Sequence, residues 1–257
     1  MSVDAFASWQ QIKTLTFASI KSRYRNTFAG LLWVVMSPLL MFGAQSYAFK
    51  LVLKLQFENY PLFLLTGLMP WIFFVQSVQM GTTSFVAQGR LLKSFPIHPF
   101  VCLSAMIADN LINFMLTFTL ILLPFLFYAQ NIHLLHFLLL PVAVFSLFIA
   151  TVGVTLFLAT LQVFFRDTRF IMDFVLSIAF YLTPIFYPKQ YVSEKWYWLV
   201  SYNPFAILIA PIQSLSRDHL ESDYFFSLSL SYFTALICFG IAVLYWRRKK
   251  NQVYFFL

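Results

Sequence analysis

Long continuous runs of apolar residues, separated by short polar connections, dominate this 257-residue chain. A helix needs about 20 mostly apolar residues to cross the roughly 30 Å hydrocarbon core of a bilayer. Because the runs are continuous rather than alternating, they predict a bundle of membrane-spanning helices and not a membrane β-barrel. The predicted spans are residues 31–49, 62–82, 100–128, 134–165, 170–187 and 225–246.

Composition agrees with a polytopic, all-α integral membrane protein. Hydrophobic residues make up 61% of the chain and charged residues 10%, whereas a soluble domain is about half apolar and about a quarter charged. A disulfide scaffold is excluded because Cys102 and Cys238 are the only cysteines and both lie inside apolar runs. The N-terminus lacks the pattern of a signal peptide. We expect one transmembrane domain: 1–30 an interface helix, 31–187 spans one to five, 188–224 an external region, 225–246 span six and 247–257 a tail.

The distribution of basic residues predicts the orientation. Six spans place the N-terminus, the 83–99 connection, the 166–169 turn and the C-terminus on one side, which carries twelve of the 17 Lys and Arg residues. The positive-inside rule therefore predicts that both termini are cytoplasmic. The net charge of +8 is then mostly a topology signal, and no basic segment lies on a soluble domain that would favour nucleic-acid binding.

The first thirty residues predict a helix with one apolar face, because apolar residues recur every three to five positions. We expect this helix to lie in the membrane interface, with its basic side toward anionic headgroups. A helix that only anchors the first span is the alternative. The apolar face comprises Phe6, Trp9, Ile12, Phe17, Ile20, Tyr24 and Phe28.

Two connections are longer than simple turns. Residues 84–99 (SFVAQGRLLKSFPIHP) predict a short amphipathic helix across the cytoplasmic mouth, stopped by Pro96 and Pro99; a solvated connector is the alternative. The external segment 188–224 is rich in Tyr and Trp and contains an apolar run, 206–215, that is too short to span. We expect a pair of short helices, broken at Asn203-Pro204, that dip back into the outer membrane face. An aromatic belt at headgroup level is the alternative.

Catalytic and metal-binding motifs are not found in the sequence. It has no G-x-x-x-x-G-K-[ST], G-x-S-x-G or H-E-x-x-H, so we expect neither ATP hydrolysis nor another reaction on this chain. His133 and His136 have helix-compatible spacing, but no Cys or acidic residue follows to complete a metal site. We expect no cofactor and no metal here.

Two acidic residues fall within apolar stretches. Asp109 lies near Asn110 and Asn113 in the third span, where a polar contact between helices is favoured over an ion pathway. Asp173 follows Arg169 by four residues, which predicts a helix-surface ion pair in a structural charged cap. A proton- or ion-coupled carrier is disfavoured, because it needs several such groups at mid-membrane.

The run IKSRYRNTFAGLLWVVMSPLL, residues 20–40, resembles the entry to the first span in membrane subunits of ABC exporters of the polysaccharide and polyol-phosphate type. FFRDTRF (164–170), LTPIFYP (182–188) and YNPF (202–205) resemble the later signatures of these capsule, O-antigen and teichoic acid exporters, in the same order. The first pattern, R-Y-x-x-[ST]-x-x-G-x-x-W-x-x-x-x-P, is matched by Arg23, Tyr24, Thr27, Gly30, Trp33 and Pro38.

This resemblance implies a homodimer in the bacterial inner membrane with two copies of a separate ATPase subunit, which binds ATP and Mg. It implies that the N-terminal helix and a coupling helix at about residues 84–95 contact the ATPase, and that helices within 190–217 form an outer gate. The expected residues are Arg90, Leu91, Leu92, Lys93 and Phe95 for ATPase coupling, Trp9, Arg23, Tyr24 and Arg25 in the interface helix, Trp33, Tyr47, Tyr181 and Tyr187 in the pore, and Trp196, Trp198, Asn203, Pro204 and Phe205 in the gate.

The mechanism that the resemblance implies is mechanical. Closure of the ATPase subunits pushes on the coupling helices, spans one and five shift, and a lipid-linked polysaccharide moves outward. Two alternatives stay open: an ABC exporter of a small molecule, drug or lipid, and a non-transporting scaffold subunit of an envelope assembly. A transporter should co-purify with a Walker-motif ATPase in near-equal amount, whereas a scaffold need not.

Overall fold

The structure, a computed structural model, describes residues 5–24, 28–53, 60–94, 98–128, 134–216 and 223–256. All regular structure within these ranges is helical, which confirms the predicted all-α class. Two 3₁₀ turns, η1 (Lys189–Tyr191) and η2 (Ser214–Ser216), accompany the α-helices. The α-helices are α1 (Ala5–Tyr24), α2 (Phe28–Leu53), α3 (Tyr60–Ala87), α4 (Gly89–Ser94), α5 (Pro99–Tyr128), α6 (Leu134–Phe164), α7 (Thr168–Leu182), α8 (Glu194–Ser201), α9 (Pro204–Gln213) and α10 (Tyr224–Phe256).

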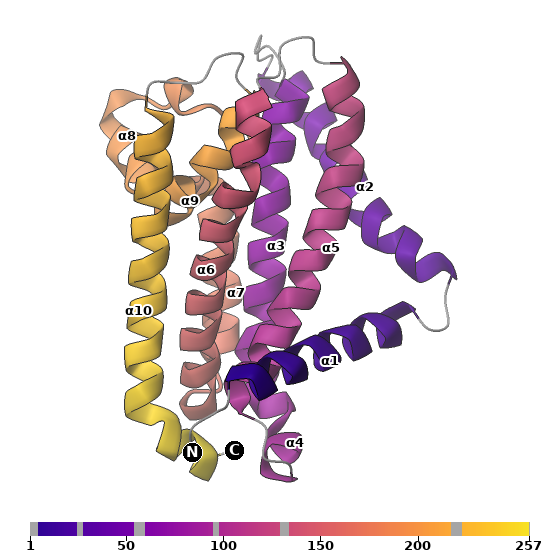
Figure 1. Cartoon of the computed structure of the whole chain (residues 1–257). Coiled ribbons are helices and arrows are strands. Elements are labelled where there is room, and N and C mark those ends of the chain that lie inside the picture. The colour runs from indigo at the N-terminus through magenta and orange to yellow at the C-terminus, as the bar shows by residue number, and fades with distance from the viewer. Residues whose placement is uncertain are drawn as a thin grey trace.

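The long helices α3, α5, α6 and α10 stand side by side as a bundle (Figure 1). At one end α1 lies across the bundle, and α4 and the last turns of α10 lie at the same end. The short helices α8 and α9 lie at the opposite end. α2 diverges from α5 as it descends toward α1, so its lower half stands apart from the bundle (Figure 1).

Four of the described helices are long and apolar enough to cross a membrane. They are α3, Pro99–Leu122 of α5, Leu138–Phe164 of α6 and Tyr224–Val253 of α10. These four coincide with predicted spans two, three, four and six. The first predicted span lies within α2, whose 26 residues correspond to about 39 Å. Membrane crossing by α2 and α7 stays a prediction.

The fifth predicted span, 170–187, is longer than the helix that forms. α7 ends at Leu182, and its 15 residues correspond to about 22 Å. Thr183 has an extended backbone, with φ −94° and ψ 135°. Pro184 follows it and disfavours helical geometry in the preceding residue. The predicted span extends to residue 187 because the sequence stays apolar to that point, whereas the helix ends two residues before Pro184.

Two other boundaries differ from the expectation. Residues 84–87 continue α3, so the short helix predicted between spans two and three is reduced to α4, and it begins at Gly89. The predicted tail is helical through Phe256, because α10 continues past the basic cluster 247–250. The predicted pair of short helices is confirmed as α8 and α9, with the break at Tyr202 and Asn203.

The central helix of the bundle is α3. It packs against α5, α6, α7 and α9, and Leu64, Leu65, Leu68 and Val78 on it have no exposed surface. Most threonine hydroxyl groups inside the bundle donate a hydrogen bond to the carbonyl oxygen four residues earlier in the same helix. Thr66, Thr82, Thr151 and Thr160 make this bond, at 2.6–2.9 Å.

The helices α6 and α10 approach each other through small residues. A Cβ atom on Gly153 would lie 2.7 Å from the backbone of Phe239 in α10, so only glycine fits there. Ser146 and Ser231 share a 2.6 Å hydrogen bond across the same contact. Small residues let membrane helices come close together. By helical spacing the same two faces carry the fully buried residues Ala143, Ala150, Ala235 and Ala242.

Two helices begin with the same local arrangement. In Asn203-Pro204-Phe205 the Asn203 side chain accepts a hydrogen bond from the Phe205 N–H at 2.9 Å. In His98-Pro99-Phe100 the His98 Nδ1 accepts from the Phe100 N–H at 3.2 Å. Proline suits the first helical position, because the N–H that it lacks would have no partner there. The polar side chain before each proline then accepts a hydrogen bond from the N–H of the residue after it. The pattern therefore fixes the starts of α5 and α9.

Candidate functional site

A polar contact joins α1 to α5. The Thr16 hydroxyl donates to the Ala105 carbonyl oxygen at 3.2 Å, and the Ser19 hydroxyl donates to Asp109 Oδ2 at 3.2 Å. Asp109 is fully buried. The contact between helices that was expected for Asp109 is therefore confirmed, and its partner helix is α1.

The side of α1 that meets α5 carries Thr16, which is buried, whereas Phe17 of the predicted apolar face is 68% exposed. The side chains of Trp9, Arg23 and Tyr24 lie outside the described part of the structure, as does Arg25. Placement of the apolar face in the membrane interface stays a prediction.

At the end of the bundle where α1 lies, α4 follows α3 almost without interruption. Leu92 is buried, and its N–H donates to the Gln88 carbonyl oxygen at 3.0 Å. The side chains of Arg90, Leu91 and Lys93 are not described, and Phe95 lies outside the described residues. The structure thus supplies the predicted short helix but does not test the roles of its residues.

His98 packs against the C-terminal half of α10. Its ring meets Trp246 edge-on with centroids 5.9 Å apart, and Trp246 also packs on Phe85 of α3 at 5.5 Å. Burial lowers the pKa of His98, and the positive charge of Lys250 lowers that pKa further. Both the low pKa and the acceptor role of Nδ1 favour the neutral imidazole.

The predicted ion pair between Arg169 and Asp173 is not the interaction that the structure shows. Asp173 Oδ1 accepts from Gln79 Nε2 of α3 at 2.9 Å, and the Arg169 N–H donates to Gln162 Oε1 of α6 at 2.9 Å. Gln162 Nε2 also donates to the Arg166 carbonyl oxygen at 2.9 Å. The side chains of Gln79 and Gln162 therefore join the start of α7 to α3 and α6, in place of the predicted ion pair.

At the opposite end, α9 is tied to the chain that follows α7. Asn203 Nδ2 donates to Thr183 Oγ1 at 3.0 Å and to the Leu182 carbonyl oxygen at 3.3 Å. Gln213 Nε2 donates to the Pro184 carbonyl oxygen at 2.9 Å and lies over Gly67 of α3. Both ends of α9 are therefore hydrogen-bonded to the turn after α7.

Phe205 at the start of α9 packs deep against α3. Its ring centroid lies 4.7 Å from that of Trp71, in an edge-on contact, and 4.9 Å from that of Phe74. Trp71 lies eleven residues, or about 16 Å, from the start of α3 at Tyr60. The first turn of α9 therefore lies well below the end of the bundle. Trp196 and Trp198 of α8, by contrast, are exposed, and Pro204 is exposed at the first turn of α9.

The four aromatic residues expected in a pore do not form one cluster in this chain. Trp33 and Tyr47 lie on α2 and are 59% and 70% exposed, and Tyr181 at the end of α7 is 67% exposed. Tyr187 is half-buried and donates its hydroxyl to the Tyr181 carbonyl oxygen at 3.1 Å. Trp33 and Tyr47 therefore lie on α2, whereas Tyr181 and Tyr187 lie at the end of α7 and in the turn after it. The role of these four residues in a pore stays a prediction.

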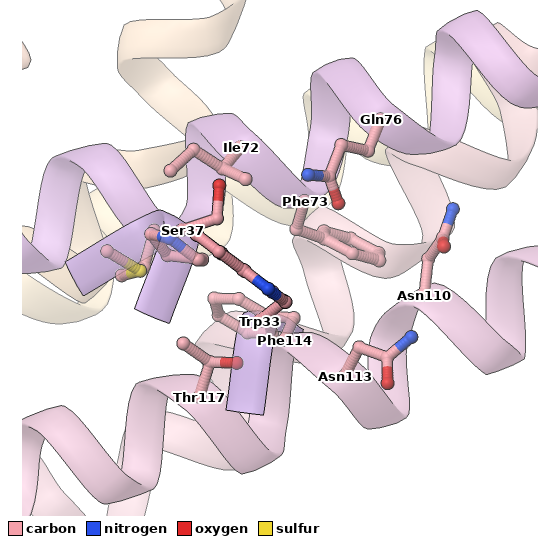
Figure 2. A pocket seen from close by; sticks show the side chains of 11 residues that line it. Trp33, Ser37, Ile72, Phe73, Gln76, Asn110, Asn113, Phe114 and Thr117 are labelled. Carbon is pink, nitrogen blue, oxygen red and sulfur yellow. The ribbon is translucent and has the colours of Figure 1, made fainter. Parts of the chain in front are cut away.

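A pocket of about 280 Å³ lies between the interiors of α2, α3 and α5 (Figure 2). In Figure 2 the Trp33 indole projects from α2 toward Phe114 of α5, and the amides of Asn110 and Asn113 lie at the side of the pocket. None of the described lining residues is charged. They are Trp33, Ser37, Pro38, Met69, Ile72, Phe73, Gln76, Asn110, Asn113, Phe114 and Thr117.

A larger cavity of about 610 Å³ lies at the far end, where α8, α9, the start of α10 and the turn after α7 meet. Lys189 and Asp223 are its charged lining residues among those described, and Tyr197 and Phe226 add aromatic surface. This cavity lies in the region that the sequence assigned to an outer gate.

Sequence reasoning did not single out the pocket of Figure 2. Trp33, Asn110 and Asn113 were noticed separately, but Ser37, Gln76 and Thr117 were not. A signal was present, because Gln76 is an amide inside an apolar run. Periodicity within one helix does not show that polar residues of three helices converge.

Comparisons with known proteins fit this architecture. The model of the ABC-2 type transporter family matches residues 10–215. The O-antigen export system permease protein RfbA of Klebsiella pneumoniae is 31% identical over 241 residues, covering 93% of this chain and 91% of the relative. RfbA of Myxococcus xanthus is 30% identical over 212 residues, covering 82% and 81%. The polysialic acid transport protein KpsM of Escherichia coli is 21% identical over 250 residues, covering 94% and 95%.

The protein is therefore a multi-pass membrane permease, and it belongs to the ABC-2 type transporter family. The family expected from the sequence motifs is confirmed.

Proposed function

We propose that this chain is the permease subunit of an ATP-driven exporter that moves a lipid-linked polysaccharide across the bacterial inner membrane. The observation that carries the proposal is similarity over nearly the whole chain to relatives named as O-antigen export permeases. A relative named for polysialic acid transport aligns over a similar extent.

The proposed topology has six spans, with α2 and α7 as the first and fifth, and both termini in the cytoplasm. It is supported by the position of α1, α4 and the last turns of α10 at one end of the bundle (Figure 1). That end carries most of the basic residues, including the cluster 247–250. The helices α8 and α9 then form the outer gate. The deep contact of Phe205 with Trp71 supports a re-entrant position for α9.

ATP and Mg are bound by a partner ATPase, present in two copies against a homodimer of this chain. The helices α1 and α4 contact the ATPase at the cytoplasmic end, with Arg90 and Lys93 as its charged contacts. The α1–α5 bonds through Ser19 and Asp109 would carry movement of α1 into the bundle. In the homodimer, the exposed aromatic residues of α2 and α7, which include Trp33 and Tyr181, would face the second copy of this chain across the transport pathway.

The first experiment is deletion of the gene in its own organism, followed by location of the envelope glycan. Lipid-linked polymer trapped in the cytoplasm, and restored to the surface by the intact gene, is the expected result and identifies the cargo. Normal surface glycan, with no functional duplicate present, would refute a polysaccharide cargo and favour an exporter of small molecules.

A charge-reversal pair tests the coupling helix separately. Arg90→Glu with Lys93→Glu should lower export while the protein still inserts in the membrane. Arg247→Glu with Arg248→Glu is a matched control, because both are exposed basic residues of α10 and lie outside the predicted coupling helix. Unchanged export by the double variant of Arg90 and Lys93 would show that these two charges are not needed for coupling.

A further inference from the structure

Unpaired polar side chains converge on the pocket between α2, α3 and α5. Among the described residues, no hydrogen bond is formed by the side chains of Trp33, Ser37, Gln76 and Thr117, all of which line this pocket. Thr117 is the most buried of these four residues, and its hydroxyl group does not donate to its own helix. Thr66, Thr82, Thr151 and Thr160 do so at comparable positions.

Burial makes the free hydroxyl group of Thr117 costly. Thr117 is 4% exposed and lies eleven residues from the nearer end of α5. Hydrocarbon offers no hydrogen-bond partner, and an unsatisfied polar group there costs several kcal/mol. A polar guest that supplies donors and acceptors would therefore stabilise the pocket.

The chemistry of the lining selects an uncharged guest. Amides and hydroxyls donate and accept, whereas no described lining residue would balance a phosphate, a carboxylate or an ammonium group. Trp33, Phe73 and Phe114 add aromatic surface, against which the apolar face of a sugar ring can pack while its hydroxyls bond to the amides. A volume of about 280 Å³ lies just below the roughly 300–1,000 Å³ of drug-sized ligand sites, so it suits one ring and not a chain.

The pocket is accessible from the surface of this chain, because Trp33 is 59% exposed and Gln76 is exposed. In the proposed homodimer this opening would face the pathway between the two copies.

We propose that this pocket binds one uncharged sugar unit of the exported glycan during its passage, with Gln76 and Thr117 as hydrogen-bonding residues and Trp33 as the packing surface. The inference rests on the proposed polysaccharide cargo. Each copy of the permease would then hold the cargo within the membrane by one ring at a time.

Binding can be measured with simple probes on the complex of this chain and its ATPase in nanodiscs. The probes are methyl α-glucoside and methyl α-rhamnoside, which are neutral, and methyl β-glucuronide, which is charged. Saturation-transfer NMR should detect the neutral glycosides and not the glucuronide. Gln76→Leu and Thr117→Val should each weaken neutral binding by about fivefold, the effect of one net hydrogen bond. Thr234→Val is the matched control, since Thr234 donates only within α10, to the Leu230 carbonyl oxygen.

Export of polymer by the same variants completes the test. Thr117→Val should slow export and Thr234→Val should not. The proposal is overturned if the wild-type complex binds no neutral glycoside, or if the pocket variants bind glycosides as the wild type does. It is also overturned if Thr117→Val loses glycoside binding but exports polymer at the wild-type rate, because the guest would then be a resident glycolipid. If the wild-type complex exports no polymer at all, the proposed function fails first.

Discussion

Gly153 allows a direct test of how α6 and α10 pack. A Cβ atom at this position would lie 2.7 Å from both the N and Cα atoms of Phe239 and 2.9 Å from the Cys238 carbonyl carbon. These are backbone atoms, which cannot rotate away as a side chain can. Since ordinary contacts begin at 3.4 Å, the Gly153→Ala variant requires the two helices to separate by about 0.7 Å at this point.

The cost follows from what lies along the same contact. Separation would stretch the 2.6 Å hydrogen bond between Ser146 and Ser231 and loosen the buried alanines beside it. Overpacking of this kind typically costs about 1–3 kcal/mol. The intrinsic preference of a helix for Ala over Gly, about 0.5–1 kcal/mol, acts in the opposite direction.

Gly240→Ala provides a matched control, because a Cβ at Gly240 meets nothing within 4 Å. Gly240→Ala gains the same helix preference for Ala over Gly but has no steric clash with a neighbouring helix. The difference in stability between the two variants therefore measures the packing cost at Gly153. We expect Gly153→Ala to be about 1–3 kcal/mol less stable than Gly240→Ala. Unfolding of the purified protein in mixed micelles, followed by circular dichroism as denaturing detergent is added, measures this difference. Equal midpoints for the two variants would refute the close backbone approach.

Three further predictions concern single side chains. His98→Asn keeps an acceptor for the N–H two residues on and removes the titrating ring. Because the pKa of His98 is lowered, the folded protein favours the neutral imidazole over the imidazolium. The contribution of neutral His98 to stability is therefore fully present above the ordinary pKa of about 6.5. It is lost as the pH falls from about 6.5 through the lowered pKa. The thermal midpoint of the wild type should therefore drop more on acidification than that of the variant, and parallel pH profiles would exclude this role. Asp109→Leu removes the buried acceptor of the Ser19 hydroxyl, so trypsin should cut α1 faster; unchanged cleavage would show that this contact does not hold α1. Asn203→Ala should lower the free energy of unfolding by about 1 kcal/mol, because the helix cap is lost. Asn203→Asp keeps the acceptor but loses the donor to Thr183, so its thermal midpoint should lie between those of Asn203→Ala and the wild type. Equal stability of all three proteins would contradict that ranking.

Hydropathy and local breakers determined much of the helical layout. Four predicted spans coincide with helices that are long and apolar enough to cross a membrane, because an apolar run of sufficient length forms a helix in lipid regardless of its neighbours. The break at Asn203-Pro204 was also predictable, since proline and a capping side chain act within a few residues. The end of α7 was missed although Pro184 marks it, because the prediction weighted hydropathy above the proline.

Which faces pack together was decided only by the tertiary structure. In water the apolar face of a helix must be buried, but lipid is as apolar as a leucine side chain, so hydropathy does not identify the packed face of a membrane helix. Small and polar residues make the contacts instead: Gly153 against α10, and Ser19 against Asp109, whereas Phe17 faces outward. The convergence of Gln76 and Thr117 on one pocket likewise depends on the rotation of two helices about their axes, and the spacing of residues along one chain segment does not encode that rotation.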